Sequence, residues 1–228
     1  MFREILRVQW KATRWPLLPF IAAAFGLPLL AVSRMPKLTG RADPLAPMAE
    51  VVLTQMQVLL PLFPLLAFLV GVATALSAWA WDHQVEHVYP LSLPVKRDRY
   101  VALKAAAGAL FLLAPTAAFW AGSHIAVAVV ELPSGLRAYP DWLTFRFLLA
   151  SLFGFALLFA FAAGTMRTAV ATLAGLVLLL VFGSLATDYL SANLTGFNFH
   201  LTPWLWDALS SWPGPFHVLT GNWMLIDV

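Results

Sequence analysis

Residues 51–81 read VVLTQMQVLLPLFPLLAFLVGVATALSAWAW, 31 positions without one acidic or basic side chain. An α-helix needs about 20 apolar residues to cross the ~30 Å hydrocarbon core of a bilayer. A soluble helix would carry charged side chains on its water-facing side. The stretch therefore predicts a membrane-spanning helix that tilts or projects beyond the hydrocarbon. Pro61 and Pro64 here, and Pro115 in a later apolar run, are expected to kink their helices.

The rest of the chain carries the same signal. Its 228 residues are 61% hydrophobic and 11% charged, whereas a soluble domain carries about 25% charged residues. Cysteine is absent from the sequence, which excludes a disulfide-stapled secreted scaffold. We therefore predict an all-α polytopic membrane protein made of a single domain, residues 1–228. Its five full transmembrane helices are expected at residues 15–34, 51–81, 101–130, 146–166 and 168–187.

The basic residues predict how these helices are oriented. With a cytoplasmic amino terminus, the inner segments hold nine Lys and Arg residues and the outer segments hold five, and cytoplasmic loops normally carry this excess. No Lys or Arg follows Arg167, so residues 188–228 are placed outside as a tail with short helices. Residues 216–228 are too few to cross a bilayer, so a sixth span is either missing or replaced by a re-entrant tail. The predicted location is the inner (cytoplasmic) membrane, with this chain's carboxyl terminus outside.

A separate amphipathic helix is expected at residues 1–15. On a helical wheel of about 100° per residue, its basic side chains share one arc, and aromatic and aliphatic side chains fill most of the remainder. Such helices lie in the membrane interface, and Pro16 would then turn the chain into the bilayer. The alternative is a basic flank with no helix of its own. The residues expected to anchor the protein at lipid phosphates are Arg3, Arg7, Lys11, Arg14, Lys96, Arg97 and Arg99.

The sequence offers little catalytic chemistry. It contains no G-x-x-x-x-G-K-[ST], G-x-S-x-G or G-x-G-x-x-G motif. The middles of the predicted spans lack ionisable residues, which argues against an ion-coupled carrier. His83-x-x-Glu86-His87 matches the pattern of one class of zinc protease, but a third ligand on the same side of the membrane is not evident. We predict no enzyme activity and no metal site, and we interpret the cluster as a polar helix end.

The following loop is more informative. From Glu86 onward it contains Leu91-Ser92-Leu93-Pro94-Val95, then Lys96-Arg97, then Lys104. This resembles the inner loop of type-2 ATP-binding-cassette (ABC) exporter permeases, which carries an acidic residue, an LSLPV stretch, one or two basic residues and a Lys early in the third span. The amphipathic first helix and the long second span are also similar, and the resemblance covers roughly residues 1–187. The family's usual sixth span and cytoplasmic carboxyl terminus are not matched.

The resemblance implies a permease subunit of an ABC exporter, forming the translocation path with a second permease chain as a homo- or heterodimer. A separate ATPase subunit would bind ATP and Mg, so this chain would need no cofactor of its own. Nucleic acid is not expected among its partners. The inner loop, residues 82–95, would couple to that ATPase. The side chains implied in this coupling are Asp82, His83, Glu86, His87 and Tyr89. Polar side chains that would face an apolar or amphiphilic substrate are Gln55, Gln57, Thr74, Ser77, Thr116 and Ser123.

Two alternatives remain open from the sequence. One is a non-transporting structural or assembly subunit of a larger membrane complex, and the other is a heme-exporter-type permease. Two ladders of small residues, Ala67-x3-Gly71-x3-Ala75 and Ala118-x3-Gly122-x3-Ala126, allow close approach between helices. They indicate either packing within one chain, which we favour, or the seam of a dimer.

Overall fold

The computed structural model describes residues 2–33, 59–84, 96–130, 136–164, 166–193 and 200–227. Most of these residues are helical. The chain divides into two compact units. Unit 1 comprises residues 1–159 and 222–228, and unit 2 comprises residues 160–221.

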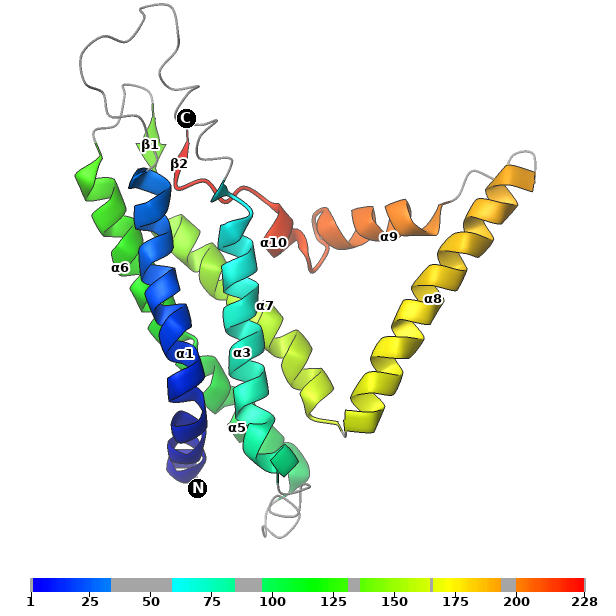
Figure 1. Cartoon of the computed structure of the whole chain (residues 1–228), viewed down its shortest axis with the longest axis horizontal. Coiled ribbons are helices and arrows are strands. Elements are labelled where there is room, and N and C mark those ends of the chain that lie inside the picture. Colours follow the sequence, from blue (N-terminus) through cyan, green and yellow to red (C-terminus); the bar gives the residue numbers. More distant parts are fainter. Residues whose placement is uncertain are drawn as a thin grey trace, which may run out of the picture. The chain divides into compact units, whose positions relative to one another are not determined.

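Unit 1 is a helical bundle (Figure 1). Its helices are α1 (Phe2–Ser33), α3 (Leu62–Gln84), α5 (Arg97–Phe111), α6 (Leu113–Val129) and α7 (Pro140–Ala162, through Phe159). Successive passes run antiparallel, with α5 and α6 together forming one pass. We call the end at which α1 and α5 begin, and α3 and α7 end, the base. The opposite end is called the strand end.

A two-stranded antiparallel sheet gives the strand end its name. Strand β1 (Arg137–Ala138) lies between α6 and α7 and pairs with β2 (Ile226–Asp227). Arg137 is opposite Asp227, and Ala138 is opposite Ile226. The Tyr139 amide extends the pairing by donating to the Leu225 carbonyl at 2.9 Å. Residues 222–227 therefore return to the same end of the bundle as the α6–α7 connection.

Within the described residues, four helical segments are long and apolar enough to cross a membrane. They are Phe2–Ser33, Leu62–Ala80, Asp98–Val129 and Pro140–Ala162. Hydrocarbon offers no hydrogen-bonding partners, and an α-helix satisfies its own backbone groups. The prediction of an all-α membrane protein is confirmed at this level. The predicted second span begins earlier than α3, but residues 51–58 lie outside the described part of the chain.

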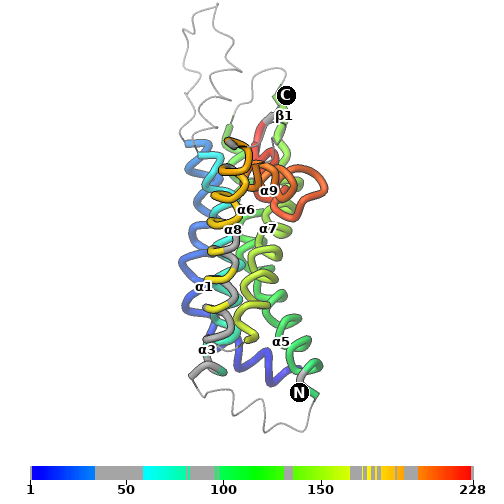
Figure 2. The backbone as a smooth tube through the Cα atoms, turned by 90° about the vertical axis from the view of Figure 1, so that its right-hand side faces the viewer, coloured from blue at the N-terminus to red at the C-terminus, as the bar shows by residue number. Residues whose placement is uncertain are grey.

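Proline positions explain the breaks and bends. The third pass is interrupted at Leu112, three residues before Pro115, as the expected kink requires. Helix α1 runs without interruption through Pro16 and Pro19, so the prediction of a separate helix ending at residue 15 is wrong. Figure 2 shows the first turns of α1 lying across the base before the helix rises along the bundle. Proline removes one hydrogen bond and clashes with the preceding turn, which bends a helix without having to end it.

Small residues bring the helices of unit 1 into backbone contact. A Cβ added at Gly71 would lie 2.2 Å from the Ser151 carbonyl oxygen of α7, and one at Gly122 would lie 2.3 Å from the Phe25 carbonyl oxygen of α1. Neither position has room for a side chain. The small-residue ladders at these glycines therefore pack within one chain, as we favoured from the sequence.

Unit 2 contains α8 (Met166–Asn193), α9 (Leu201–Ser210) and α10 (His217–Thr220). Hydroxyl groups join its helices: Thr202 Oγ1 donates to Ser184 Oγ at 2.9 Å, and Thr220 Oγ1 donates to the Ser210 carbonyl at 2.9 Å. The short helices expected after the fifth apolar run are present as α9 and α10. Neither is long enough to cross a membrane.

Candidate functional site

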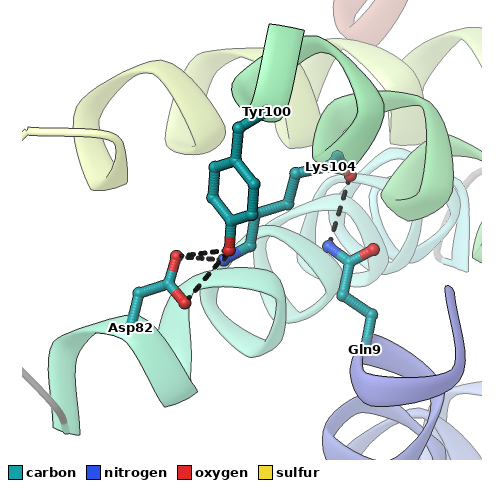
Figure 3. A network of polar contacts seen from close by, with 4 residues as sticks. All are labelled: Gln9, Asp82, Tyr100 and Lys104. Atoms are coloured by element: carbon teal, nitrogen blue, oxygen red, sulfur yellow. Dashed lines mark hydrogen bonds and ion pairs between the residues drawn. The ribbon is translucent and has the colours of Figure 1, made fainter. Parts of the chain in front are cut away.

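A buried polar network lies at the base of the bundle (Figure 3). Asp82 comes from the last turn of α3, and Tyr100 and Lys104 come from α5. The Lys104 ammonium donates to Asp82 Oδ2 and forms an ion pair with it. The Tyr100 hydroxyl donates to the same carboxylate, at 3.3 Å from Oδ1 and 3.2 Å from Oδ2. Asp82 and Lys104 are only 2% and 3% exposed, so both charges are removed from solvent.

The order of the helices explains why these groups meet. Helix α3 ends at the base and α5 begins there (Figure 1), so the last turn of α3 lies near the first turns of α5. Tyr100 and Lys104 are four residues apart and therefore share one face of α5. Burying a single unpaired charge costs a large amount of free energy. The Asp82 carboxylate and the Lys104 ammonium therefore stabilise each other in the buried state. The Lys104 ammonium also lies 4.2 Å from the centroid of the Trp79 ring, where cation–π attraction adds to the pairing.

Helix α1 joins the network through Gln9. Its Nε2 donates to the Lys104 backbone carbonyl at 3.2 Å (Figure 3). Gln9 is 3% exposed, and Thr13, one turn further along the same helix, is 1% exposed. Among the described residues, Gln9 Oε1 and Thr13 Oγ1 have no hydrogen-bond partner. The network therefore ties three helices, α1, α3 and α5, at one height in the bundle.

The structure corrects one of the predicted coupling residues. Asp82 was expected to contact a partner ATPase, but its carboxylate is buried and paired with Lys104. It is unavailable to a partner and acts instead as a tie between helices. Glu86, His87, Tyr89 and the side chain of His83 lie outside the described residues.

The predicted lipid anchors are exposed wherever the structure describes their side chains. Six of their side chains are exposed: Arg3, Arg7, Lys11, Arg14, Lys96 and Arg99. The side chain of Arg97 lies outside the described residues. Exposure is necessary for contact with phosphates, and all six meet that condition.

Three of the six predicted substrate-path residues form hydrogen bonds within their own helices. Thr74, Ser77 and Thr116 donate to carbonyls four residues earlier in their own helices, at 2.8, 2.7 and 2.8 Å. Such bonds satisfy a hydroxyl without any partner outside its helix. Ser123 is fully buried, and its Oγ has no partner among the described residues. Gln55 and Gln57 lie outside the described part of the chain.

A second polar cluster lies at the strand end. Asp141 Oδ1, in the first turn of α7, accepts from Trp120 Nε1 at 2.9 Å and lies 3.0 Å from His124 Nε2. The side chains of His124 and Asp141 are 41% and 78% exposed. Among the described residues, no three His, Cys, Asp or Glu side chains lie close enough together to hold a metal ion. The cluster is a surface hydrogen-bonded group that joins α6 to α7.

Sequence reasoning did not assemble the network at the base. It noted Asp82 and Lys104 separately and did not predict any role for Gln9, Trp79 or Tyr100. A signal was present, because Asp82 and Lys104 are opposite charges near the same-side ends of two consecutive apolar runs. Ionisable residues that reach into hydrocarbon normally pair with one another, so these two could have been paired from the sequence.

Comparison with known proteins identified no relative of this chain. No family model, no curated protein and no solved structure matches the chain. The resemblance of residues 86–104 to ABC permeases therefore stays a sequence-based expectation. The described residues establish a helical membrane protein whose base holds a buried, ion-paired network.

Proposed function

We propose that this chain is the membrane-spanning permease subunit of an ABC exporter. It would pair with a second permease chain and couple through its inner loop, residues 82–95, to a separate ATPase subunit. Its place would be the inner (cytoplasmic) membrane, with the base on the cytoplasmic side. The sequence pattern from Glu86 to Lys104 supports the family, and an apolar or amphiphilic substrate is the class that its membrane segments suit.

The observation that carries the proposal is the tie between the two helices flanking that loop. A loop can transmit a push only if the helices on either side move with it and do not separate. Pulling Lys104 from Asp82 would leave two buried charges uncompensated, which resists separation. Because Gln9 attaches α1 to the same point, a force on the loop would move three helices together. Asp82 and Lys104 are then positioning residues, and His83, Glu86, His87 and Tyr89 remain the proposed contacts.

The chain path supports five crossings. The chain leaves unit 1 after Phe159, near the base, and re-enters it at Asn222, at the strand end. The intervening residues must connect these two ends. Helix α8 has 28 residues and at ~1.5 Å per residue extends about 42 Å, which is enough for a crossing. The excess of basic residues on one side agrees with this topology, in which the base faces the cytoplasm and residues 222–227 lie outside.

A non-transporting scaffold is the second candidate, and one observation favours it. Three of the four described path residues, Thr74, Ser77 and Thr116, bond to their own helices and offer no polar lining. A subunit that only anchors or assembles a complex needs no such lining. No observation on the described residues favours the heme-exporter type.

ATP turnover of the complex with its ATPase separates these candidates. In the permease, the Glu86 carboxylate accepts a charge-assisted hydrogen bond from the ATPase, worth ~1.5–3 kcal/mol. Glu86→Ala should therefore lower ATPase binding or stimulation by roughly tenfold or more, at ~1.4 kcal/mol per decade. Glu50→Ala, in the predicted outer segment, is the matched control and should change neither quantity.

The histidines complete the test. His83→Ala and His87→Ala should have smaller effects than Glu86→Ala, because neutral imidazoles make weaker contacts. A zinc enzyme would lose activity equally in all three variants, and a chelator would reproduce the loss. A scaffold would show unchanged ATP turnover in all three, which would refute the coupling role of the loop.

A further inference from the structure

The bend in α1 encloses a groove on one side of the helix. The groove has a volume of about 260 Å³ and is lined by Trp10, Arg14, Trp15, Leu17, Leu18 and Ile21, all of them residues of α1. Pro16 and Pro19 are exposed and at about 100° per residue lie about half a turn away from the groove. Because a helix bends away from its prolines, the groove is the concave side of the bend.

The wall of this groove is apolar, with a single cation. Of its apolar lining residues, Leu17 is 1% exposed, whereas Trp15 and Leu18 are 67% and 52% exposed. Arg14 is the one charged residue among the six, and its guanidinium lies 5.5 Å from the centroid of the Trp15 ring. The Trp10 ring is supported from α5 by Phe111, with ring centroids 5.6 Å apart. The groove is therefore an apolar slot with a positive charge on its lining.

The position of Arg14 along the helix fits a membrane boundary. Ser33, where α1 ends, lies nineteen positions after Arg14, and at ~1.5 Å per residue this distance is about 28 Å. This is close to the ~30 Å thickness of the hydrocarbon core. Arg14 thus lies where lipid phosphates are found, and Leu17, Leu18 and Ile21 extend from it toward the acyl chains.

We propose that this groove binds one anionic phospholipid. The phosphate pairs with the Arg14 guanidinium, whose planar donors match phosphate oxygens. One acyl chain lies along Leu17, Leu18 and Ile21, and the indoles of Trp10 and Trp15 sit at the headgroup level, as interfacial tryptophans do. The site depends on the membrane location of α1 and not on a transport function, so its failure and that of the permease proposal are separate outcomes.

Native mass spectrometry of the full chain in detergent tests the site. Phosphatidylglycerol and phosphatidylcholine with the same acyl chains are titrated in parallel, and one phosphatidylglycerol should be retained in preference. Arg14→Gln should lower its retention about fivefold, the size of one basic residue's attraction to an anionic surface. Arg7→Gln, an exposed basic residue outside the groove lining, is the matched control and should change retention less than twofold.

A second pair of variants tests the apolar slot. Leu18→Trp fills the groove and should abolish preferential retention, whereas Leu30→Trp, at a 57% exposed position of the same helix, should leave it intact. Circular dichroism verifies folding, and Ile21→Trp serves as the filling variant if Leu18→Trp does not fold. Equal losses in Arg14→Gln and Arg7→Gln would reveal general charge attraction and overturn the site. Retention unaffected by filling the groove, or displacement of the lipid by glycerol phosphate without acyl chains, would also overturn it.

Discussion

The two ends of the bundle join consecutive helices with similar chemical groups in opposite environments. At the base, Asp82 and Lys104 connect α3 to α5 and are almost fully buried. At the strand end, His124 and Asp141 connect α6 to α7 and are exposed. Solvent screens a surface pair until it contributes little, whereas separating a buried pair strands two charges in a low dielectric. Burial, more than the contact itself, decides which pair constrains the fold.

The strand end compensates through its backbone and its packing. Residues 222–226 are held there by the β1–β2 pairing and by the Arg146 guanidinium, which donates to the Asn222 carbonyl at 2.7 Å. Trp223 is 1% exposed, and its ring centroid lies 5.5 Å from the Arg146 guanidinium carbon. The base is therefore stabilised by a buried ion pair, and the strand end by backbone pairing and packing. Variants at each end can distinguish these two contributions.

The largest expected effect concerns the sides of the membrane on which the two ends lie. The chain has no native cysteine, so single cysteines report access without background. Ser92→Cys, in the loop at the base, should react with an impermeant thiol reagent only after the membrane is opened. Ser33→Cys, exposed at the strand end, should react in intact cells. Labelling of Ser92→Cys from outside would reverse the orientation proposed for both ends.

Breaking the pair at the base should cost the most stability. Lys104→Ala leaves the Asp82 carboxylate buried and uncompensated, and we expect a loss of ~3–5 kcal/mol in the free energy of unfolding. Unfolding in mixed micelles of increasing SDS content measures it. Lys96→Ala, an exposed lysine near the same end, should change stability by no more than ~0.5 kcal/mol. The double variant Asp82→Leu with Lys104→Met should recover most of the loss, and a double variant as unstable as Lys104→Ala would contradict the charge argument.

Removing the cation at the strand end should have an intermediate effect. Arg146→Ala deletes the bond to the Asn222 carbonyl and the contact with Trp223. Hydrogen bonds to charged groups are worth ~1.5–3 kcal/mol, and partial exposure lowers the expected loss to ~1–2 kcal/mol. Unfolding in mixed micelles of increasing SDS content measures the loss. The exposed Arg137 of β1 provides the control, since Arg137→Ala should change the free energy of unfolding by no more than ~0.5 kcal/mol.

The smallest effect is expected at the exposed pair. Asp141→Ala removes the acceptor shared by Trp120 and His124. Because the cluster is exposed, water can form hydrogen bonds with both groups in place of the carboxylate. The SDS unfolding midpoint should stay within the error of the measurement. A loss as large as that of Lys104→Ala would show that exposure does not govern the difference between the two ends.

Much of the bundle could be predicted from the sequence because hydrocarbon restricts the choices. Long apolar runs leave few alternatives to a helix, and Gly71 and Gly122 mark close contacts because only a missing side chain permits them. The pairing of Asp82 with Lys104 was accessible in principle from their positions at adjacent helix ends. Gln9 was not, because a single amide in a basic segment gives no sign that α1 will bury it. Strands of two residues, such as β1 and β2, show no alternating pattern, so the return of Trp223 to the bundle could only be seen in three dimensions.

The sheet at the strand end also has a consequence for the order of events during synthesis. Arg137 precedes its partner Asp227 by 90 residues, and at ~5–20 residues per second the partner is made about 4.5–18 s later. Throughout that interval the β1 edge stands without its neighbour, and α7 must enter the membrane guided by its hydrophobicity and its contacts with earlier helices. The strand pairing therefore cannot direct the insertion of α7. The two strands pair last, and they stabilise an arrangement of helices that has already formed in the membrane.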